Sequence, residues 1–445
     1  MQTRREKLGY GMTLMPSLEE LVPTDHPLRR LDRVLNLDFI HDAVADKYCP
    51  DNGRPSIDPE VVIRLFLLQA IEGIVHVRDL MRQVQVNLAY RWFIGYGVDE
   101  KLPDHSTLSK ALDRLGGEVF DELFSRSISQ CKKSGLIEGK VLHVDATTIR
   151  ADLDVTRVNK ADSPDRDARF GRFPDGKIRP GYKQHTVADG KNRVVLDVSV
   201  TAANGSEHDE AVSVIDEAVA RLDAPPEAVC ADGAYASGEN KDSLNNRGIR
   251  LVSPPAKARK ATCQGKFTVE DFVYEESDDV YVCPAGERLT FRGFDSTRPG
   301  RREYMVSGRP CRHCPYRSRC TTSNRRRLRV GPHHQSLNQL RADSQTESFK
   351  NLYRSRAPVI EGVFAEAKQW HGLRRAWRRG LSKMRVQCLL IASVLNFKRL
   401  ATVSLSLLVD LFRFIMPSDA HNRDQSDENP FATGFLAKLA SIVAA

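Results

Sequence analysis

Four short apolar segments between residues 140 and 255 constrain the fold of this chain most strongly. They cover residues 141–144, 192–201, 228–231 and 249–252, and each has the length and composition of a buried strand. Residues 208–222, between the second and the third, carry apolar side chains at helical spacing. Strands that alternate with helices indicate an α/β domain around a central sheet.

The sequence on either side of this pattern has a different character. Residues 59–68 and 77–81 carry apolar residues at helical spacing, and Asp104 begins a capping segment before a helix at 108–112. Residues 256–345 contain prolines, glycines, arginines and five cysteines without a regular period, and helical spacing returns at 359–368 and 384–400. We therefore predict five parts: a helical N-terminal domain at 1–135, an α/β domain in two pieces at 136–255 and 346–405, an insertion at 256–345, and a tail at 406–445.

Basic residues are clustered along the chain. Lys and Arg outnumber Asp and Glu by 67 to 58, and residues 298–329 hold eleven arginines against the single acid Glu303. A second basic run covers residues 374–385. One such run is usually a solvated face, but two runs favour a nucleic-acid partner, because a local basic field attracts a polyanion.

The arginines of the N-terminal helices leave two interpretations open. Arg78, Arg82 and Arg91 lie on or between short predicted helices. They fit a helix-turn-helix-like DNA-binding domain, and they fit equally a helical packing domain with exposed arginines.

Neither a membrane span nor a secreted location is expected. The N-terminal residues MQTRREKLGYGM lack the apolar core of a signal peptide, and Lys398, Arg399 and Asp410 interrupt the apolar stretch near the C-terminus. Nine cysteines without a signal peptide indicate reduced thiols or metal ligands rather than a disulfide framework. We therefore expect a cytoplasmic protein.

Four cysteines of the insertion are candidate zinc ligands. Cys283, Cys311, Cys314 and Cys320 form the pattern C…CxxC-x5-C, which suits tetrahedral thiolate coordination. A structural zinc ion would order a segment that we expect to be too poor in apolar residues to form its own core. Free cysteines remain the alternative, because the spacing is irregular.

Two acids each follow an apolar strand, where open α/β sheets place ligands and catalytic groups. Asp145 stands in HVDATTIRAD and Asp232 in CADGAYAS. One such acid is often a cap or a turn former. Two neighbouring carboxylates repel each other and persist where a cation such as Mg2+ or Mn2+ binds. Glu361 is the expected third acid, since Lys368 lies two helical turns along the same face, whereas Glu366 lies on a different face.

Several stretches together resemble the DDE-domain transposases of bacterial insertion sequences. They are PDHSTLSK at 103–110, HVDATTIRAD, GYKQHTVAD at 181–189, CADGAYAS, and the block that holds Tyr353, Arg356, Glu361 and Lys368. The likeness spans residues 15–405. The motif of the family places three residues between its Arg and its Glu, whereas four residues separate Arg356 from Glu361 here.

The resemblance implies a ribonuclease H-like catalytic domain with the cysteine-bearing segment inserted into it. It also implies an endonuclease and strand transferase in which Asp145, Asp232 and Glu361 hold two divalent ions, Mg2+ or Mn2+. The enzyme would cleave strands at the ends of its element and join the 3′-hydroxyls to target DNA. The implied partner is double-stranded DNA, bound by a homodimer. The residues that we expect to contact DNA are Lys368, Arg356, Tyr353, Lys183, Arg374 and Arg375. For Lys183, an exposed polar strand is the alternative.

Two other interpretations remain. The chain could be a catalytically inactive DNA-binding protein derived from a transposase, acting as a repressor or an architectural protein, or a metal nuclease of repair or of RNA. The three acids and Lys368 favour activity. The helical N-terminal domain and the arginine-rich insertion favour recognition of specific DNA ends.

Overall fold

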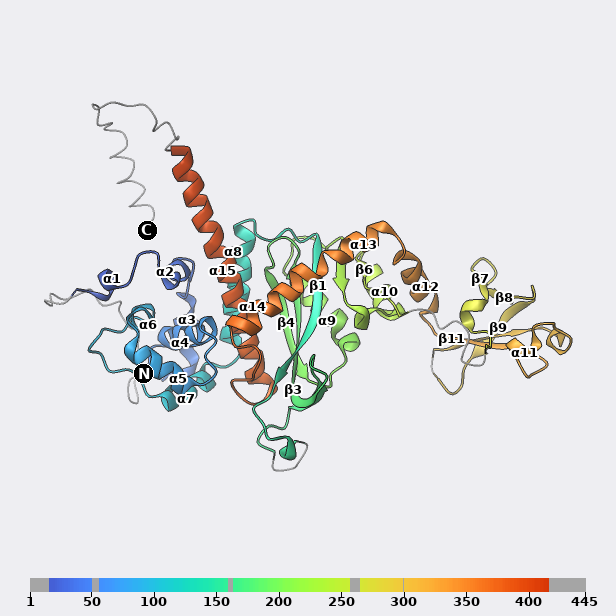
Figure 1. The fold of residues 1–445 in the computed structure, drawn as a ribbon, viewed down its shortest axis with the longest axis horizontal. Coiled ribbons are helices and arrows are strands. Elements are labelled where there is room, and N and C mark those ends of the chain that lie inside the picture. The colour runs from blue at the N-terminus through green and yellow to red at the C-terminus, as the bar shows by residue number, and fades with distance from the viewer. Residues whose placement is uncertain (1–15, 50–55, 159–162, 257–264, 299, 416–445) are drawn as a thin grey trace. The chain divides into compact units, whose positions relative to one another are not determined.

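The fold is built around a central six-stranded sheet (Figure 1). The computed structural model describes residues 16–49, 56–158, 163–256, 265–298 and 300–415. Strand β3 pairs antiparallel with β1 on one side and with β4 and β2 on the other, and β5 and β6 continue the sheet parallel to β1. This is the ribonuclease H-like topology that the sequence resemblance implied. The strands are β1 (Val141–Arg150), β2 (Arg169–Arg172), β3 (Ile178–Asp189), β4 (Val195–Ala202), β5 (Ala228–Ala231) and β6 (Arg250–Val252).

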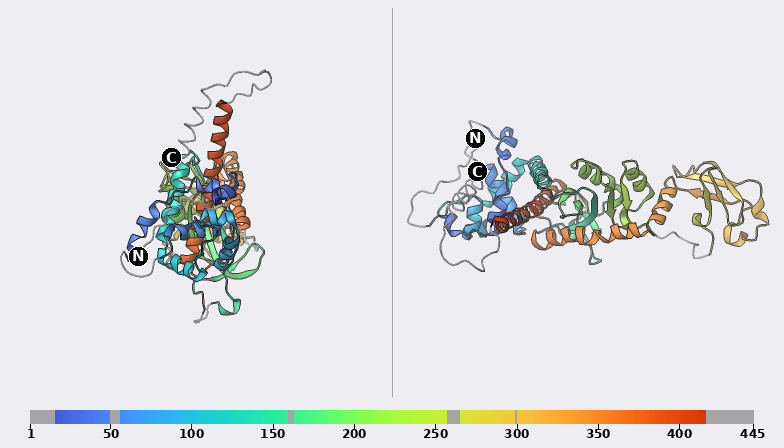
Figure 2. Two further views of the ribbon diagram at one scale, coloured as in Figure 1. Left: turned by 90° about the vertical axis from the view of Figure 1, so that its left-hand side faces the viewer. Right: turned by 90° about the horizontal axis from the view of Figure 1, so that it is seen from above.

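Helices cover both faces of this sheet, as the right-hand view of Figure 2 shows. On one face α9 packs against β3 and β4, and α10 packs against β6 and α9. On the other face α13 packs against β5 and β6, and the helical turn η6 against β1 and β3. These elements are α9 (Glu207–Val219), α10 (Gly238–Asn245), α13 (Glu347–Arg354), η6 (Ala357–Glu361) and α14 (Gly362–Trp370).

Strand β1 is longer than the sequence predicted. The apolar pattern ends at Val144, but β1 continues to Arg150 because Asp145 to Arg150 pair with β3. The threonines and the isoleucine of this extension are β-branched and suit a strand. The prediction that Asp145 ends its strand is therefore wrong: Asp145 lies where the parallel pairing of β1 with β5 stops.

The N-terminal region is helical, as predicted. Asp104 accepts a hydrogen bond from the Ser106 N–H and caps α7, as its position suggested. Arg78 and Arg82 are exposed, but Arg91 is buried and donates to backbone carbonyl groups of Gln85, Gly97 and Glu100, so its role is structural. The helices are α1 (Leu18–Leu21), α2 (Pro27–Asp32), α3 (Phe39–Ala43), α4 (Pro59–Ile71), α5 (Val77–Val86), α6 (Leu88–Phe93), α7 (His105–Leu115) and α8 (Glu118–Lys133).

The insertion folds around its own core, which corrects our expectation that it is too poor in apolar residues. Within the described residues it holds a five-stranded antiparallel sheet whose buried side chains include Tyr281, Leu289, Tyr304 and Leu328. These aromatic and aliphatic residues alternate with arginines along the strands, so composition alone conceals them. The elements are β7 (Val273–Glu275), β8 (Val280–Val282), β9 (Arg288–Phe294), β10 (Arg302–Val306), α11 (Arg317–Cys320) and β11 (Arg327–Val330). The helix that follows, α12 (His334–Asp343), packs against α10 of the catalytic domain.

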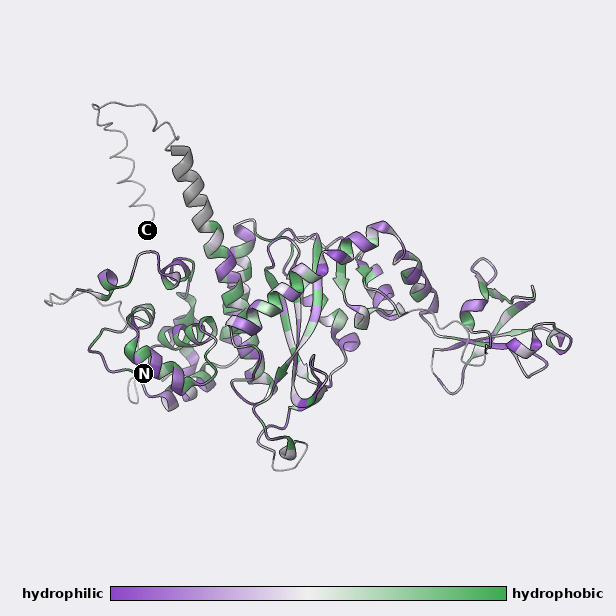
Figure 3. Cartoon of the chain, viewed as in Figure 1, coloured by the Kyte–Doolittle hydropathy of each residue, from purple (hydrophilic) through white to green (hydrophobic). Residues whose placement is uncertain are grey.

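Helix α15 (Leu381–Ile415) anchors the end of the catalytic fold to the sheet. Its buried Asn396 accepts from the Val195 N–H at 2.8 Å and donates to the Val195 carbonyl at 2.9 Å. Figure 3 shows green, apolar turns along the part of α15 that is not grey. By length and composition the part Leu381–Val403 would suffice to cross a membrane, but 72% of its most apolar window is buried, as in a core helix. Of the predicted tail at 406–445, residues 406–415 continue α15, and residues 416–445 lie outside the described residues.

Candidate active site

The parallel register of β1 and β5 places two predicted catalytic acids side by side. Val144 pairs with Ala231, Asp145 is the next residue of β1, and Asp232 directly follows the end of β5. Asp232 also accepts a hydrogen bond from the Ala234 N–H at 2.9 Å and caps the short turn η3 (Gly233–Tyr235). Asp232 therefore both caps this turn and forms an acidic pair with Asp145.

Asp145 is a buried carboxylate with a guanidinium as its main partner. Arg356 Nη2 lies 2.7 Å from Asp145 Oδ2, and the two side chains are only 9% and 16% exposed. Burial raises the pKa of Asp145 to about 6; Arg356 opposes this rise, and the nearby charges of Asp232 and Glu207 add to it. A cation beside Asp145 therefore stabilises the ionised carboxylate, which burial alone makes unfavourable.

The extra residue between Arg356 and Glu361 is taken up by a π-helical turn. The turn η6 covers Ala357–Glu361 and is followed directly by the α-helix α14. A π-turn bonds residue i to i+5, so it absorbs one inserted residue while the flanking residues keep the faces they have in an α-helix. Pro358, which lacks an N–H, suits this break in the regular bonding. The four-residue spacing is therefore equivalent in space to the three-residue spacing of the family motif.

The two acids that compete for the third position have opposite surroundings. Glu361 is exposed at the end of η6. Glu366 forms ion pairs with Lys398 and Arg399 and lies 3.8 Å from His371 Nε2. Although burial opposes them, these partners hold the pKa of Glu366 far below its ordinary value. Glu366 is thus occupied within the protein, and Glu361 remains the candidate.

The structure brings Asp145 and Asp232 together but does not gather Glu361 with them. Among the residues that the structure describes, no three His, Cys, Asp or Glu side chains lie close enough to share a metal ion. Carboxylate oxygens are nevertheless the ligands that Mg2+ and Mn2+ prefer, and Asp145 already binds a cationic group. The donor set fits a divalent ion, provided that Glu361 moves inward.

The predicted DNA-contacting residues lie in two different settings. Arg374 and Arg375 are exposed on a segment that is hydrogen-bonded to Arg150 at the end of β1. Lys368 is half-buried, and burial together with Arg374 lowers its pKa, while Asp145 opposes this shift. Tyr353 stacks against Phe349 with ring centroids 6.3 Å apart.

Lys183 has a partner inside the protein. Its Nζ lies 2.9 Å from Glu207 Oε1 and 2.9 Å from the Gly205 carbonyl oxygen, and its side chain is 14% exposed. The alternative of an exposed polar strand is wrong, because Gln184 and His185 beside it are buried. That Lys183 contacts DNA stays a prediction.

Two residues near the acids, Glu207 and Tyr235, were not predicted from the sequence. Glu207 begins α9, and its charge acts on Asp145. Tyr235, at the end of η3, is 1% exposed. Burial raises the pKa of Tyr235, and so do the charges of Glu207, Asp145 and Asp232. An acid in the first turn of a helix is commonplace, so the sequence offered no signal for Glu207.

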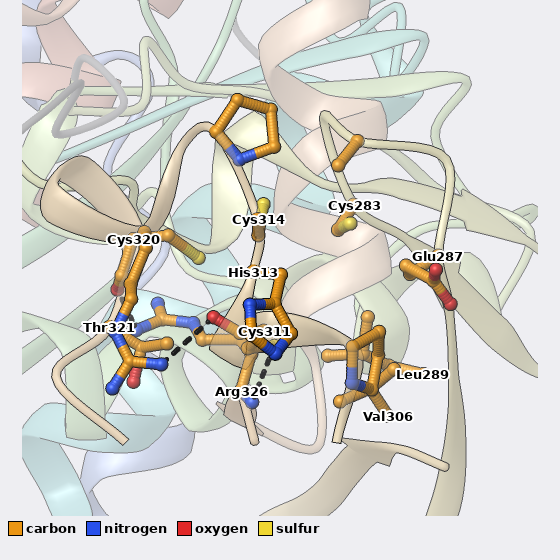
Figure 4. A pocket seen from close by; sticks show the side chains of 14 residues that line it. Cys283, Glu287, Leu289, Val306, Cys311, His313, Cys314, Cys320, Thr321 and Arg326 are labelled. Carbon is orange, nitrogen blue, oxygen red and sulfur yellow. Dashed lines mark hydrogen bonds between the residues drawn. The ribbon is translucent and has the colours of Figure 1, made fainter. Parts of the chain in front are cut away.

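The four predicted zinc ligands line one pocket of about 250 Å3 in the insertion (Figure 4). Cys311 Sγ accepts a hydrogen bond from the Arg326 N–H at 3.3 Å. Burial raises the pKa of the Cys320 thiol, and the neighbouring cysteines add to this rise. The pocket brings the cysteines into one place, but within the described residues they do not reach the spacing of a shared ion.

Comparison with known proteins identifies two domains. The family model named Transposase domain (DUF772) matches residues 16–114, and the model named Transposase DDE domain matches residues 282–401. No curated protein matches the sequence.

Two solved structures illustrate the distance to known relatives. The piggyBac transposase synaptic complex with hairpin DNA is 12% identical over 92% of this chain and 88% of that chain, with a TM-score of 0.35. The Mos1 transposase paired-end complex with left transposon end is 12% identical over 45% of this chain and 61% of that chain, with a TM-score of 0.17. At such scores the assignment rests on the two family models. The family acts on DNA and depends on divalent metal ions. The chain therefore carries a transposase domain and a transposase DDE domain, which support an enzyme that cleaves DNA and transposes it.

Proposed function

We propose that this enzyme is the transposase of a bacterial insertion sequence, which cleaves strands at the ends of its element and joins the freed 3′-hydroxyls to target DNA in the cytoplasm. The observation that carries the proposal is the register of β1 and β5, which sets Asp145 beside Asp232 beneath the helix that bears Glu361. Two carboxylates at adjacent strand positions, with a third acid on a helix over the same face, suit phosphoryl transfer with two divalent ions.

Asp145, Asp232 and Glu361 are the residues that would hold Mg2+ or Mn2+. Bound there, the ions would activate the attacking hydroxyl and stabilise the leaving oxygen. Arg356 pairs with Asp145 in the protein alone and must release it when an ion binds. The freed guanidinium would then face the DNA backbone. Arg356 would thus pair with Asp145 in the metal-free protein and contact a phosphate group when an ion is bound.

The exposed basic segment after α14 would bind the DNA beside the cleavage site. Backbone hydrogen bonds to Arg150 fix the segment of Arg374 and Arg375 to the end of β1, the strand that carries Asp145. Lys368 and Tyr353 extend this surface along α14 and α13. Synapsis of two ends requires two active sites, and we propose a homodimer on DNA.

We also propose that Cys283, Cys311, Cys314 and Cys320 hold a structural zinc ion. Their common pocket and the N–H···S bond to Cys311 support this, since hydrogen bonds to thiolates are a usual outer-shell feature of such sites. The insertion has its own core, so zinc would order the loops around the pocket rather than the whole domain.

A cleavage assay on a labelled duplex that carries the flanking end of the element tests the proposal. We expect Mg2+- or Mn2+-dependent cutting that Asp145→Ala, Asp232→Ala and Glu361→Ala each abolish while DNA binding survives. Glu347→Ala, which removes another exposed acid from the neighbouring helix, is the matched control and should cut normally. Binding without cutting by the unmodified protein would favour the inactive, repressor-like alternative. Cutting by the Glu361→Ala variant would place the third acid elsewhere.

A further inference from the structure

The first turn of α9 lies beside the catalytic acids. His208 Nε2 is 2.9 Å from Ser237 Oγ, and α9 packs against η3, the turn that follows Asp232. These contacts bring Glu207, the residue before His208, to the same edge of the sheet as Asp145 and Asp232. Glu207 has no counterpart in the three-acid motif.

A partly buried ion pair keeps Glu207 in place. Lys183 Nζ lies 2.9 Å from Glu207 Oε1, and the two side chains are 14% and 22% exposed. Lys183 also donates to the Gly205 carbonyl, so its position is fixed from two sides. A carboxylate near two others is repelled by them, and the ammonium of Lys183 offsets this repulsion when no metal ion is present.

A buried hydroxyl points to a ligand at this place. Tyr235 is 1% exposed, and among the described residues its hydroxyl has no hydrogen-bond partner. Tyr235 ends η3, the turn that Asp232 caps and against which α9 packs, and the charges of Glu207, Asp145 and Asp232 act on its hydroxyl. A buried hydroxyl without a partner is costly, and this one becomes satisfied if a carboxylate turns towards it.

We propose that Glu207 is a fourth carboxylate of the divalent-ion site. When an ion binds between Asp145 and Asp232, Glu207 leaves Lys183, turns towards the ion and accepts a hydrogen bond from the Tyr235 hydroxyl. Lys183 is a positioning residue that holds Glu207 ready in the metal-free enzyme. This inference rests on the proposed function, because it takes Asp145 and Asp232 to be the ion ligands.

Mn2+ binding to the full chain, followed by the electron paramagnetic resonance signal of free Mn2+, tests the inference without an activity readout. We expect Glu207→Gln to weaken Mn2+ binding by at least about 10- to 100-fold, because the loss of a direct ligand should cost no less than the loss of a group that supports one. Tyr235→Phe should weaken it about fivefold, as the loss of one hydrogen bond does. Asp209→Asn is the matched control: it removes a 76% exposed acid from the same helical turn and should leave affinity within about twofold.

A lysine variant separates a role in ion binding from a purely structural one. Lys183→Met removes the competitor for Glu207, so Mn2+ should bind equally well or about threefold more tightly. A structural Lys183 would instead be needed for folding, and binding would fall. The double variant Glu207→Gln/Lys183→Met keeps the test valid if the single change unfolds the protein, and it should match Glu207→Gln.

Asp145→Asn distinguishes failure of this inference from failure of the proposed function. If Asp145→Asn abolishes Mn2+ binding and Glu207→Gln leaves it unchanged, Glu207 is not a ligand and the inference is overturned. If neither substitution changes binding, the ions bind elsewhere and the proposed active site is wrong as well.

Discussion

The acids of the central sheet and the acids of the insertion sheet have opposite surroundings. In the insertion, Asp279 accepts hydrogen bonds from the hydroxyls of Tyr274 and Tyr304 and pairs with Arg302, and these partners lower its pKa although burial opposes them. In the central sheet, burial raises the pKa values of Asp145 and Asp197 to about 6 despite nearby arginines. Asp279 is thus satisfied within the protein, whereas burial leaves Asp145 and Asp197 costly to ionise. Of these two, Asp145 also lies beside Asp232, where a cation from outside can offset its charge.

The largest expected difference in cleavage comes from neutralising one acid in each of the two sheets. Asp145→Asn should lower metal-dependent cleavage about 1,000-fold or more, as loss of a principal electrostatic group in an active site does. Asp279→Asn should leave cleavage within about twofold, because Asp279 serves only the insertion. Single-turnover rates on a labelled end duplex measure both. Equal losses for the two variants would remove the distinction between the sheets.

A core substitution in the insertion tests whether that sheet is stable on its own packing. Leu289 is fully buried there, and Leu289→Ala should cost about 2 to 5 kcal/mol of local stability. Hydrogen exchange of the full chain should show lost protection in β8 to β10. Mn2+ binding at Asp145 should be unchanged. Loss of Mn2+ binding would show that the two sheets are coupled.

Asp197 is expected to make the stability of the folded protein depend on pH. Its pKa rises from 3.8 to about 6 because it is buried, while Arg221 at 3.3 Å opposes this rise. The folded state therefore binds its proton more tightly than the unfolded state, and the stability this contributes is complete below about pH 4 and is lost as pH rises through 6. The shift corresponds to about 3 kcal/mol.

The matching variant removes this pH dependence. The stability of Asp197→Asn relative to the unmodified protein should increase by about 3 kcal/mol between pH 4 and pH 7, measured by urea unfolding at each pH. A constant difference across this range would mean that Asp197 has an ordinary pKa in the folded enzyme.

The smallest expected effect comes from shortening the π-turn. Deletion of Ala357 restores the spacing of the family motif, and a regular α-helix should then keep Arg356 and Glu361 on their present faces. We expect cleavage within about tenfold of the unmodified enzyme. Insertion of an alanine after Glu366 is the control. No π-turn compensates for this added residue, so Lys368 rotates to another face of the helix and cleavage should be abolished. A complete loss on deletion would show that the π-turn itself is needed.

The sequence predicted β1, β4, α9, β5 and β6 in their order because these elements follow from local patterns, but it did not predict β2, and β3 entered only as the polar-strand alternative at Lys183. The apolar run at 228–231 and the amphipathic run at 208–222 became β5 and α9 with small changes at their ends. The length of β1 and the core of the insertion were missed, because both depend on pairing with distant strands. Tertiary pairing extended β1 beyond its apolar run, and alternation with arginines concealed the apolar face of the insertion.

The identity of the acids at the site could be predicted from the sequence better than the contacts that the site residues make. The motif spacing selected Glu361 over Glu366, and the ion pairs of Glu366 agree with this choice. The ion pair of Lys183 with Glu207 joins residues on β3 and α9, and no local pattern reports such a contact. The one-residue departure between Arg356 and Glu361 became interpretable only through the geometry of η6.

Anomalous diffraction at the manganese absorption edge, from crystals of the enzyme with its end DNA and Mn2+, tests the central claim most directly. We predict manganese peaks in contact with the Asp145 and Asp232 carboxylates, Glu361 drawn in as a further ligand, and Arg356 released from Asp145. Peaks elsewhere, or Arg356 still paired with Asp145 and no manganese beside it, would contradict the assignment of these acids as the catalytic metal site.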